Sequence, residues 1–248
     1  ESGWDVKGLL KLMVMSRTYR QSAVVDKERL RRDPENRLLS RGPRTRLQAE
    51  MLRDQALFLS GLLVERLGGP SWWVYQPAGL WLEVEKRGTF VQDHGEKLYR
   101  RSLYSRIRRT VAPPSMLLFD MPSREMCTVK RTLTNTPLQA LALMNEVTYV
   151  EAAKKFAERM MTEGGTPGER IAWGFRCATS RVADGEELDI LVKGYERRVE
   201  HYRNNGKAAE DLLGQGESKV PGYLPKPEMA ALTTVANVIL NLDEVINR

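Results

Sequence analysis

One cluster of titratable side chains stands out in the sequence, at Asp93-His94-Gly95-Glu96. An imidazole between two carboxylates can move protons in acid–base catalysis, and all three side chains are metal-ligand types. With Arg101 nearby to stabilise negative charge, the candidate catalytic residues are Asp93, His94, Glu96 and Arg101. The structural alternative, which we favour, is that Asp93 and Glu96 form an N-terminal cap on a turn leading to Tyr99. No second histidine cluster is present, so the sequence predicts no metal site.

A thiol nucleophile is the next possibility, because Cys127 would be activated if His94 lay beside it. The alternative that we favour is an inert, buried thiol at both Cys127 and Cys177. The two cysteines lack the paired spacing of a zinc site. The sequence also lacks a phosphate-binding glycine loop, a Gly-x-Ser-x-Gly elbow and a Cys-x-x-Cys-His haem motif. We therefore predict no cofactor in this chain.

Basic and aromatic side chains could bind an anionic or flat ligand. The net charge is +7, from 39 Lys and Arg and 32 Asp and Glu. The sequence contains no long block of one sign of charge, which favours a salt-bridged, solvated surface. Trp72, Trp73 and Trp81, near Tyr75, could stack on a sugar or a base, and packing in the core is the alternative that we favour. Nucleic acid is accordingly the weakest partner prediction.

Five segments carry helix-start patterns in which a short oxygen-bearing side chain can cap free amides. Thr136-Pro137 and Thr166-Pro167 are followed by Gln139 and Glu169, which can reach back to the cap amide and complete capping boxes. The remaining starts are at Ser2, Asp33 and Asp184. We expect helices to begin at all five.

Apolar residues at helical spacing extend these starts. The predicted helices cover 47–67, ended by Gly68-Gly69-Pro70, then 145–161, 184–202, a short one near 208–213 and a last one from about Pro227. The middle, 71–127, has short apolar runs broken by turn formers, so any strands should lie there, and 102–107 could be a strand or a helical turn.

The fold class predicted from these patterns is mainly α: one multi-helix globular domain over 1–248, with a loop-rich centre holding at most a few short strands. Possible sub-lobes are 1–135 and 136–248. No apolar run is long enough to span a bilayer. The first residues show neither an initiator Met nor a signal peptide, so we expect a fragment or a processed product.

Several short stretches together resemble a known family. The clearest are Asp33-Pro34-Glu35-Asn36-Arg37, Leu80-Trp81, Gln92-Asp93-His94-Gly95-Glu96, Arg124-Glu125-Met126-Cys127, Asn135-Thr136-Pro137-Leu138-Gln139-Ala140-Leu141 and Leu240-Asn241-Leu242-Asp243-Glu244. Through them the chain resembles the C-terminal domain of unknown function in large exported proteins of planctomycetes and related bacteria. Those proteins often carry a c-type cytochrome domain near their N-terminus.

The resemblance implies an exported module, periplasmic or at the cell surface, with haem c only in a domain outside this chain. It implies no known reaction. It also implies that the segment from Arg124 to Gln139 matters. The candidate binding residues are Arg124, Arg131, Asn135 and Gln139 from this segment, together with Trp81.

Three functions follow as hypotheses. The leading one is a non-catalytic interaction module that packs against a neighbouring domain of the full-length protein through the region 71–135. The alternative is an enzyme, or half of one, that acts on a polysaccharide or other acidic polymer through the His94 cluster. A weaker alternative is nucleic-acid binding, which needs one continuous basic face.

Overall fold

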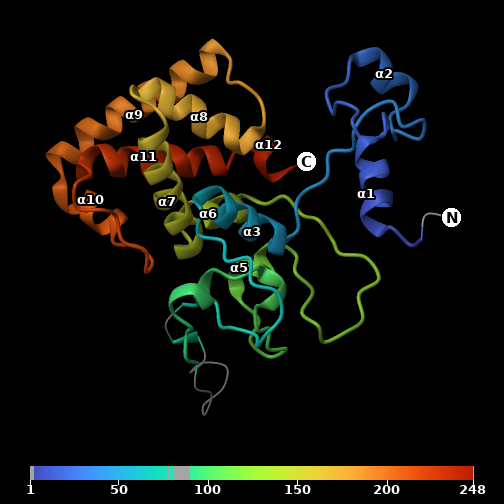
Figure 1. Cartoon of the computed structure of the whole chain (residues 1–248), viewed down its shortest axis with the longest axis horizontal. Helices are drawn as coiled ribbons and strands as arrows, with labels where there is room; N and C mark the ends of the chain where they lie inside the picture. Colours follow the sequence, from blue (N-terminus) through green and yellow to red (C-terminus); the bar gives the residue numbers. More distant parts are fainter. Residues whose placement is uncertain (1–2, 78, 81–89, 248) are drawn as a thin grey trace. The chain divides into compact units, whose positions relative to one another are not determined.

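The computed structural model describes residues 3–77, 79–80 and 90–247. Helices account for 54% of it and strand for 3%, so the predicted mainly α fold class is confirmed (Figure 1). By internal contacts the chain divides into unit 1, Glu1–Arg46 with Asn247–Arg248, and unit 2, Leu47–Ile246. Compact units can belong to one folding domain, so the predicted single domain with sub-lobes 1–135 and 136–248 stays a prediction.

The described residues of unit 1 form two helices, α1 (Val6–Met15) and α2 (Lys27–Arg32). The carboxylates of Asp5 and Asp26 cap them by accepting hydrogen bonds from Gly8 N at 2.9 Å and Arg29 N at 2.8 Å. Helix α1 buries none of its residues, although most of its side chains are large and apolar. The apolar face of α1 is therefore left uncovered within unit 1.

The helix start predicted at Asp33 is wrong. Asp33 follows the end of α2, and its carboxylate accepts hydrogen bonds from the amides of Arg37 and Leu38, both at 2.8 Å. The guanidinium of Arg41 donates to the carbonyls of Asp33 and Pro34, both at 2.7 Å, and fixes the same turn. An aspartate before a proline suits a capped turn as well as a helix start, and here the turn forms.

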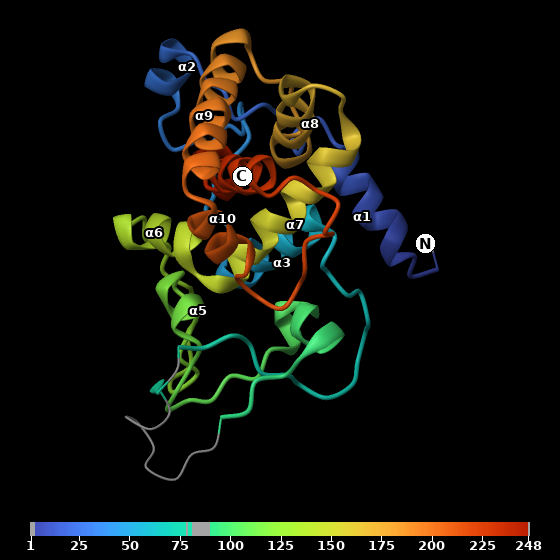
Figure 2. The ribbon, with the colours of Figure 1, turned by 90° about the vertical axis from the view of Figure 1, so that its left-hand side faces the viewer.

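Unit 2 is built around two long helices, α7 (Val147–Glu163) and α11 (Lys226–Leu240), which lie across each other in its middle (Figures 1 and 2). The other helices of the unit pack against this pair or beside it. Among the residues that the structure describes, they are α3 (Ala49–Ser60), α5 (Pro114–Leu118), α6 (Pro137–Asn145), α8 (Pro167–Thr179), α9 (Gly185–Asn204), α10 (Gly206–Leu213) and α12 (Asp243–Ile246). None of the described helices is long and apolar enough to cross a membrane.

Local chemistry explains most helix boundaries of unit 2. The capping boxes predicted at Thr136 and Thr166 are confirmed at the starts of α6 and α8, and the helix start predicted at Asp184 is confirmed at α9, where a capping box also forms. The predicted end of the first long helix at 68–70 is wrong, because α3 ends at Gly61, whose φ of 77° is left-handed and favours glycine. The amides of Leu62 and Leu63 then bond back to Leu57 O, so these apolar residues belong to the helix cap.

The described part of the central region holds two short 3-10 helices, η1 (Gly95–Tyr99) and η2 (Ser102–Tyr104), and isolated bridges where the sequence allowed short strands. The buried guanidinium of Arg53 organises it from α3. It donates to the carbonyls of Leu98 at 2.7 Å and Arg100 at 3.0 Å, and it stacks 4.5 Å from the ring centre of Trp72. One cation thereby replaces the hydrogen bonds that a sheet would supply.

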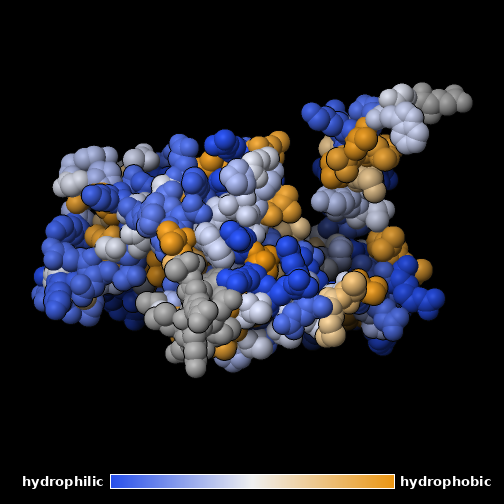
Figure 3. All heavy atoms as spheres, turned by 90° about the horizontal axis from the view of Figure 1, so that it is seen from below, coloured by the Kyte–Doolittle hydropathy of each residue, from blue (hydrophilic) through white to orange (hydrophobic). Residues whose placement is uncertain are grey.

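Two apolar clusters form the core of unit 2. One joins α7, α8, α9 and α11, and the other joins α3, α5, α6 and the start of α7 with Trp72. Apolar side chains still reach the surface in places, interspersed with charged ones (Figure 3). Such exposed patches are where binding surfaces should be sought.

Candidate functional site

The His94 cluster lies on the surface of unit 2, at the start of η1. The Nδ1 atom of His94 makes a short contact with Oε1 of Glu217, and Gly95 N donates to Oε2 of Glu217 at 3.0 Å. The His94 side chain is 72% exposed, whereas that of Glu217 is 28% exposed. The structure therefore pairs His94 with a carboxylate from the loop after α10, far away in sequence.

The other candidate catalytic residues do not join this pair. Asp93 accepts a hydrogen bond from Trp73 N at 2.9 Å and lies 3.4 Å from Lys97 Nζ, so the predicted capping of η1 by Asp93 is wrong. Glu96 and Arg101 are exposed side chains. Asp93 is engaged by the backbone because residues 73 and 93 also pair through Asp93 N and Trp73 O.

A buried carboxylate, that of Glu151 on α7, fixes the loop that carries Glu217. Tyr75 donates its hydroxyl to Glu151 Oε2 at 2.9 Å and Tyr99 donates to Oε1 at 2.8 Å. The amide of Glu217 donates to the Tyr75 hydroxyl at 3.0 Å. Burial, together with the neighbouring Glu151 carboxylate, raises the pKa of both tyrosines, so they remain hydrogen-bond donors.

Lys154, one helical turn after Glu151, holds the same loop. It is fully buried, and its Nζ donates to the carbonyls of Leu213 at 3.1 Å, Gln215 at 2.5 Å and Ser218 at 2.5 Å. Sequence analysis missed Glu151, Lys154 and Glu217. The available clue was that Glu151 and Lys154 stand among the apolar residues Tyr149, Val150, Ala152, Ala153 and Phe156, which leave little of the helix surface for solvent.

The electrostatics favour an ionised Glu217. Burial raises the pKa of its carboxyl, but hydrogen bonds from Gly95 N and His94 outweigh this and hold the pKa below the usual value. A carboxylate at Nδ1 orients the imidazole and leaves Nε2 to exchange protons with a ligand. The pair is therefore chemically able to act as an acid–base group on an open surface.

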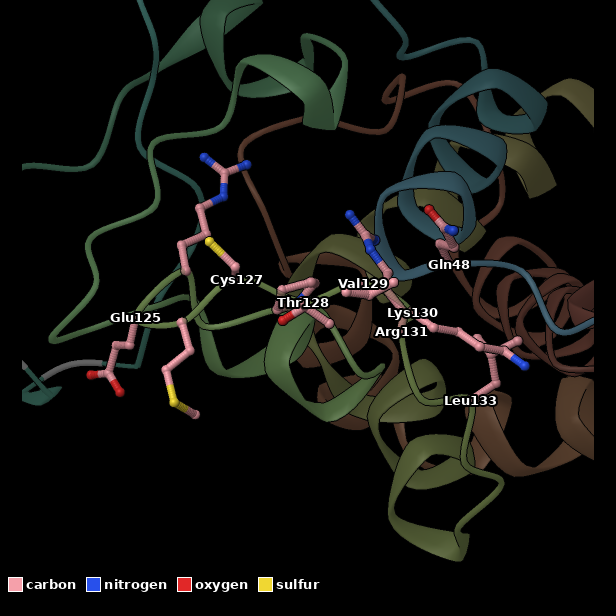
Figure 4. A pocket seen from close by; sticks show the side chains of 11 residues that line it. Gln48, Glu125, Cys127, Thr128, Val129, Lys130, Arg131 and Leu133 are labelled. Atoms are coloured by element: carbon pink, nitrogen blue, oxygen red, sulfur yellow. The ribbon is translucent and has the colours of Figure 1, made fainter.

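Two of the candidate binding residues, Arg124 and Arg131, lie on what we call the 122–133 loop, which bounds a hollow of about 750 Å³ (Figure 4). The lining includes three cations, Arg124, Lys130 and Arg131, against one carboxylate, Glu125. Apolar groups are presented beside them. The exposed apolar side chains are Met126 at 81%, Val129 at 104% and Leu133 at 51%.

The loop is anchored at both of its ends. Arg131 donates to Glu50 on α3 through two nitrogens, at 2.7 and 3.0 Å. Asp120 accepts from Thr134 N at 2.7 Å, and Thr134 Oγ1 accepts from the Gln139 amide at 3.0 Å. These contacts give a long irregular loop a defined base.

Gln139 and Arg131 thus serve mainly to position the loop. Gln139 is fully buried and also donates to Leu118 O at 2.8 Å, so its side chain faces the interior. Arg124 lines the hollow, and Asn135 is exposed just beyond the loop. Trp81 lies outside the described residues.

The prediction of a buried Cys127 is wrong. Cys127 is an exposed free thiol that lines the 122–133 hollow, whereas Cys177 is partly buried on α8. The prediction was wrong because it relied on the general tendency of lone cysteines to be buried. No residue near Cys127 in the sequence indicates that this loop stands away from the core. In the part of the chain that the structure describes, no three His, Cys, Asp or Glu side chains converge as a metal site.

Comparison with protein families gives a match. The family model PSD1, described as a protein of unknown function (DUF1553), matches residues 1–195. That range contains the His94 cluster, the 122–133 loop and α7, but not Glu217 or α11. Neither the curated proteins nor the solved structures contain a significant match.

Proposed function

Because the chain belongs to the PSD1 family of proteins of unknown function (DUF1553), we propose a function from its surfaces: it is an interaction module. The observation that carries the proposal is the 122–133 loop, which presents exposed apolar side chains and cations around a hollow on a fixed base. Loops held on a rigid scaffold are common binding elements. In this proposal the surface binds a partner and catalyses no reaction.

The partner that suits this surface is an extended protein segment with acidic and apolar residues. Arg124 and Lys130 would attract the acidic groups, and Met126 and Val129 would bury apolar ones. The net charge of +7 favours approach of an acidic partner. We propose that the segment belongs to a neighbouring domain of the same polypeptide.

The resemblance to exported, cytochrome-associated proteins supports two further parts of this proposal. The module would act outside the cytoplasm, and its neighbour would belong to a polypeptide that also carries haem c in another domain. Fractionation of the native host, with an antibody to this chain and a haem stain, tests both parts. A cytoplasmic pool without haem would oppose them.

Selection from a random peptide library tests the binding surface. We expect enrichment of peptides that combine Asp or Glu with Leu or Phe, and a Kd below about 100 μM by calorimetry. A fluorophore on the exposed thiol of Cys127 would report binding at the loop. Arg124→Ser with Lys130→Ser should weaken binding about tenfold, which corresponds to 1.4 kcal/mol.

The matched control removes the same charge from α9, with Lys193→Ser and Arg198→Ser, both exposed. It should leave the Kd unchanged. Equal losses in the two double variants would mean that net charge alone drives binding. Absence of any selected peptide that binds the loop would count against the proposal.

The His94–Glu217 pair favours a second candidate, hydrolysis of a polysaccharide or other acidic polymer. A carboxylate that orients an imidazole is a recurrent acid–base arrangement. Release of dye from a panel of dye-linked polysaccharides, lost in His94→Gln, would support it. Release that survives His94→Gln would remove His94 from any such reaction.

A further inference from the structure

A second hollow lies where α6 meets α7, and its lining shares no residue with that of the 122–133 loop. We call it the α6–α7 pocket. Its volume of about 460 Å³ falls in the range of small-molecule sites. Its walls are largely apolar, formed by Pro77, Pro114, Leu118, Leu138, Ala142 and Val147.

Glu146 is the acidic residue among the described residues that line this pocket, and those described residues include no Lys or Arg. Glu146 ends α6 and caps α7, accepting from Thr148 N at 2.9 Å and Thr148 Oγ1 at 3.1 Å. Among the described residues no cation lies within salt-bridge distance of Glu146; Arg53 acts on it only from farther away. Each carboxylate oxygen keeps a lone pair for another donor.

Burial makes the charged form of Glu146 energetically unfavourable. Burial raises the pKa of the carboxyl, although Thr148 and the more distant Arg53 oppose that effect. A cation brought into the pocket would offset the loss of water around the carboxylate. The apolar walls would at the same time favour a ligand with a hydrocarbon body.

We propose that the α6–α7 pocket binds a small organic cation: a protonated amine carried on an apolar ring or chain. The amine would donate to Glu146, and the apolar body would lie against Pro114, Leu118 and Leu138. This site is independent of the interaction surface and could be occupied while a partner is bound at the 122–133 loop.

Three ligands of one shape test the charge requirement on the full chain: phenethylammonium, the neutral 2-phenylethanol and the anionic 3-phenylpropionate. In ¹H–¹⁵N spectra we expect saturable shifts at Leu118 and Val147, with a Kd below about 1 mM for the cation. The neutral ligand should bind more weakly and the anion should not bind. Equal affinity for cation and neutral ligand would overturn the proposal.

Two variants locate the site. Glu146→Gln keeps a capping oxygen and should raise the Kd for phenethylammonium about tenfold, the equivalent of 1.4 kcal/mol, whereas Glu96→Gln, an exposed carboxyl on η1, should not. Leu138→Trp changes an exposed position of α6 and should block the pocket without touching the cap of α7. Undiminished binding in Leu138→Trp, or in a folded Glu146→Gln variant, would refute the assignment.

Discussion

Arg131 and Glu50 form a two-pronged ion pair between the 122–133 loop and the first turn of α3, with Nη1 2.7 Å from Oε2 and Nη2 3.0 Å from Oε1. Both side chains are less than a third exposed. Burial raises the pKa of Glu50, but the hydrogen bonds and charge of Arg131 outweigh this and lower it. The pair is therefore well placed to determine the order of the loop.

Glu50→Gln should loosen the loop without unfolding unit 2. We expect faster hydrogen exchange across residues 124–133 and a loss of about 1 kcal/mol, or about 2–4 °C in Tm. The exposed Glu65 gives a matched control, because Glu65→Gln removes the same charge from the surface. Unchanged exchange in the Glu50 variant would show that the loop is fixed by Asp120 and Gln139 alone.

The parts of this fold that sequence predicts are those set by neighbours along the chain. The boxes at Thr136 and Thr166 and the helix start at Asp184 need only residues within one turn, and they form as expected. Asp33 and Gly61 show the limit of such reasoning. Asp33 satisfies a turn as well as a helix, and a left-handed glycine ends α3 before the apolar run does.

The site itself depends on contacts that local patterns do not encode. His94 and Glu217 are 123 residues apart, and Tyr75 and Glu151 are 76 apart. Their pairing follows from the packing of the 214–218 loop over α7, which no periodicity or motif specifies. The sequence could indicate that His94 has a side chain suited to acid–base chemistry, but it could not indicate which carboxylate would orient the imidazole.

The ion pairs of Arg181 should give unit 2 a defined acid dependence. Arg181 binds Glu187 at 2.6 Å and Glu244 at 2.6 Å, and its hydrogen bonds, with that of Asp184 N, lower the pKa of Glu187 from 4.5 to about 2. A carboxyl with a lowered folded-state pKa contributes stability that is present above pH 4.5 and lost as the pH falls toward 2.

Glu187→Gln should therefore lower Tm by about 1–3 °C above pH 4.5, since surface ion pairs contribute little. The difference from the parent protein should shrink as the pH approaches 2. Calorimetry across that range is the measurement, with Glu186→Gln in the same helical turn as the control. A difference that stays constant to low pH would contradict the assigned ion pair.

Lys154→Met should be strongly destabilising, even though methionine is apolar and the position is buried. The change leaves the carbonyls of Leu213, Gln215 and Ser218 without their buried donor, and each unsatisfied group costs about 1–3 kcal/mol unless water reaches it. Burial lowers the pKa of Lys154. We expect Lys154→Met to lose some stability even at a pH where the amine of the parent protein is neutral, because the neutral amine still donates hydrogen bonds.

Urea denaturation of Lys154→Met should show a loss of at least about 2 kcal/mol. Lys193→Met, at an exposed site on α9, should change stability by less than about 0.5 kcal/mol. If the two variants unfold alike, the 214–218 loop is held by Glu151 rather than by Lys154.

Gly216 is the position where the loop tolerates least change. Its φ of 74° is left-handed, and a Cβ there would lie 2.3 Å from Cδ of the buried Glu151. Gly216→Ala should thus combine backbone strain with a clash, for a loss of about 2–4 kcal/mol in urea denaturation. Gly222→Ala, six residues on, meets no atom within 4 Å and should be near neutral.

A double-variant cycle separates the two causes. If the clash with Glu151 dominates, Glu151→Ala should cost less in the Gly216→Ala background than alone, because the contact is already broken. If strain at φ dominates, the two losses should add. Additive losses would leave Gly216 required for the turn alone, whereas a coupling above about 0.5 kcal/mol would show that the close approach of this loop to Glu151 on α7 itself contributes to stability.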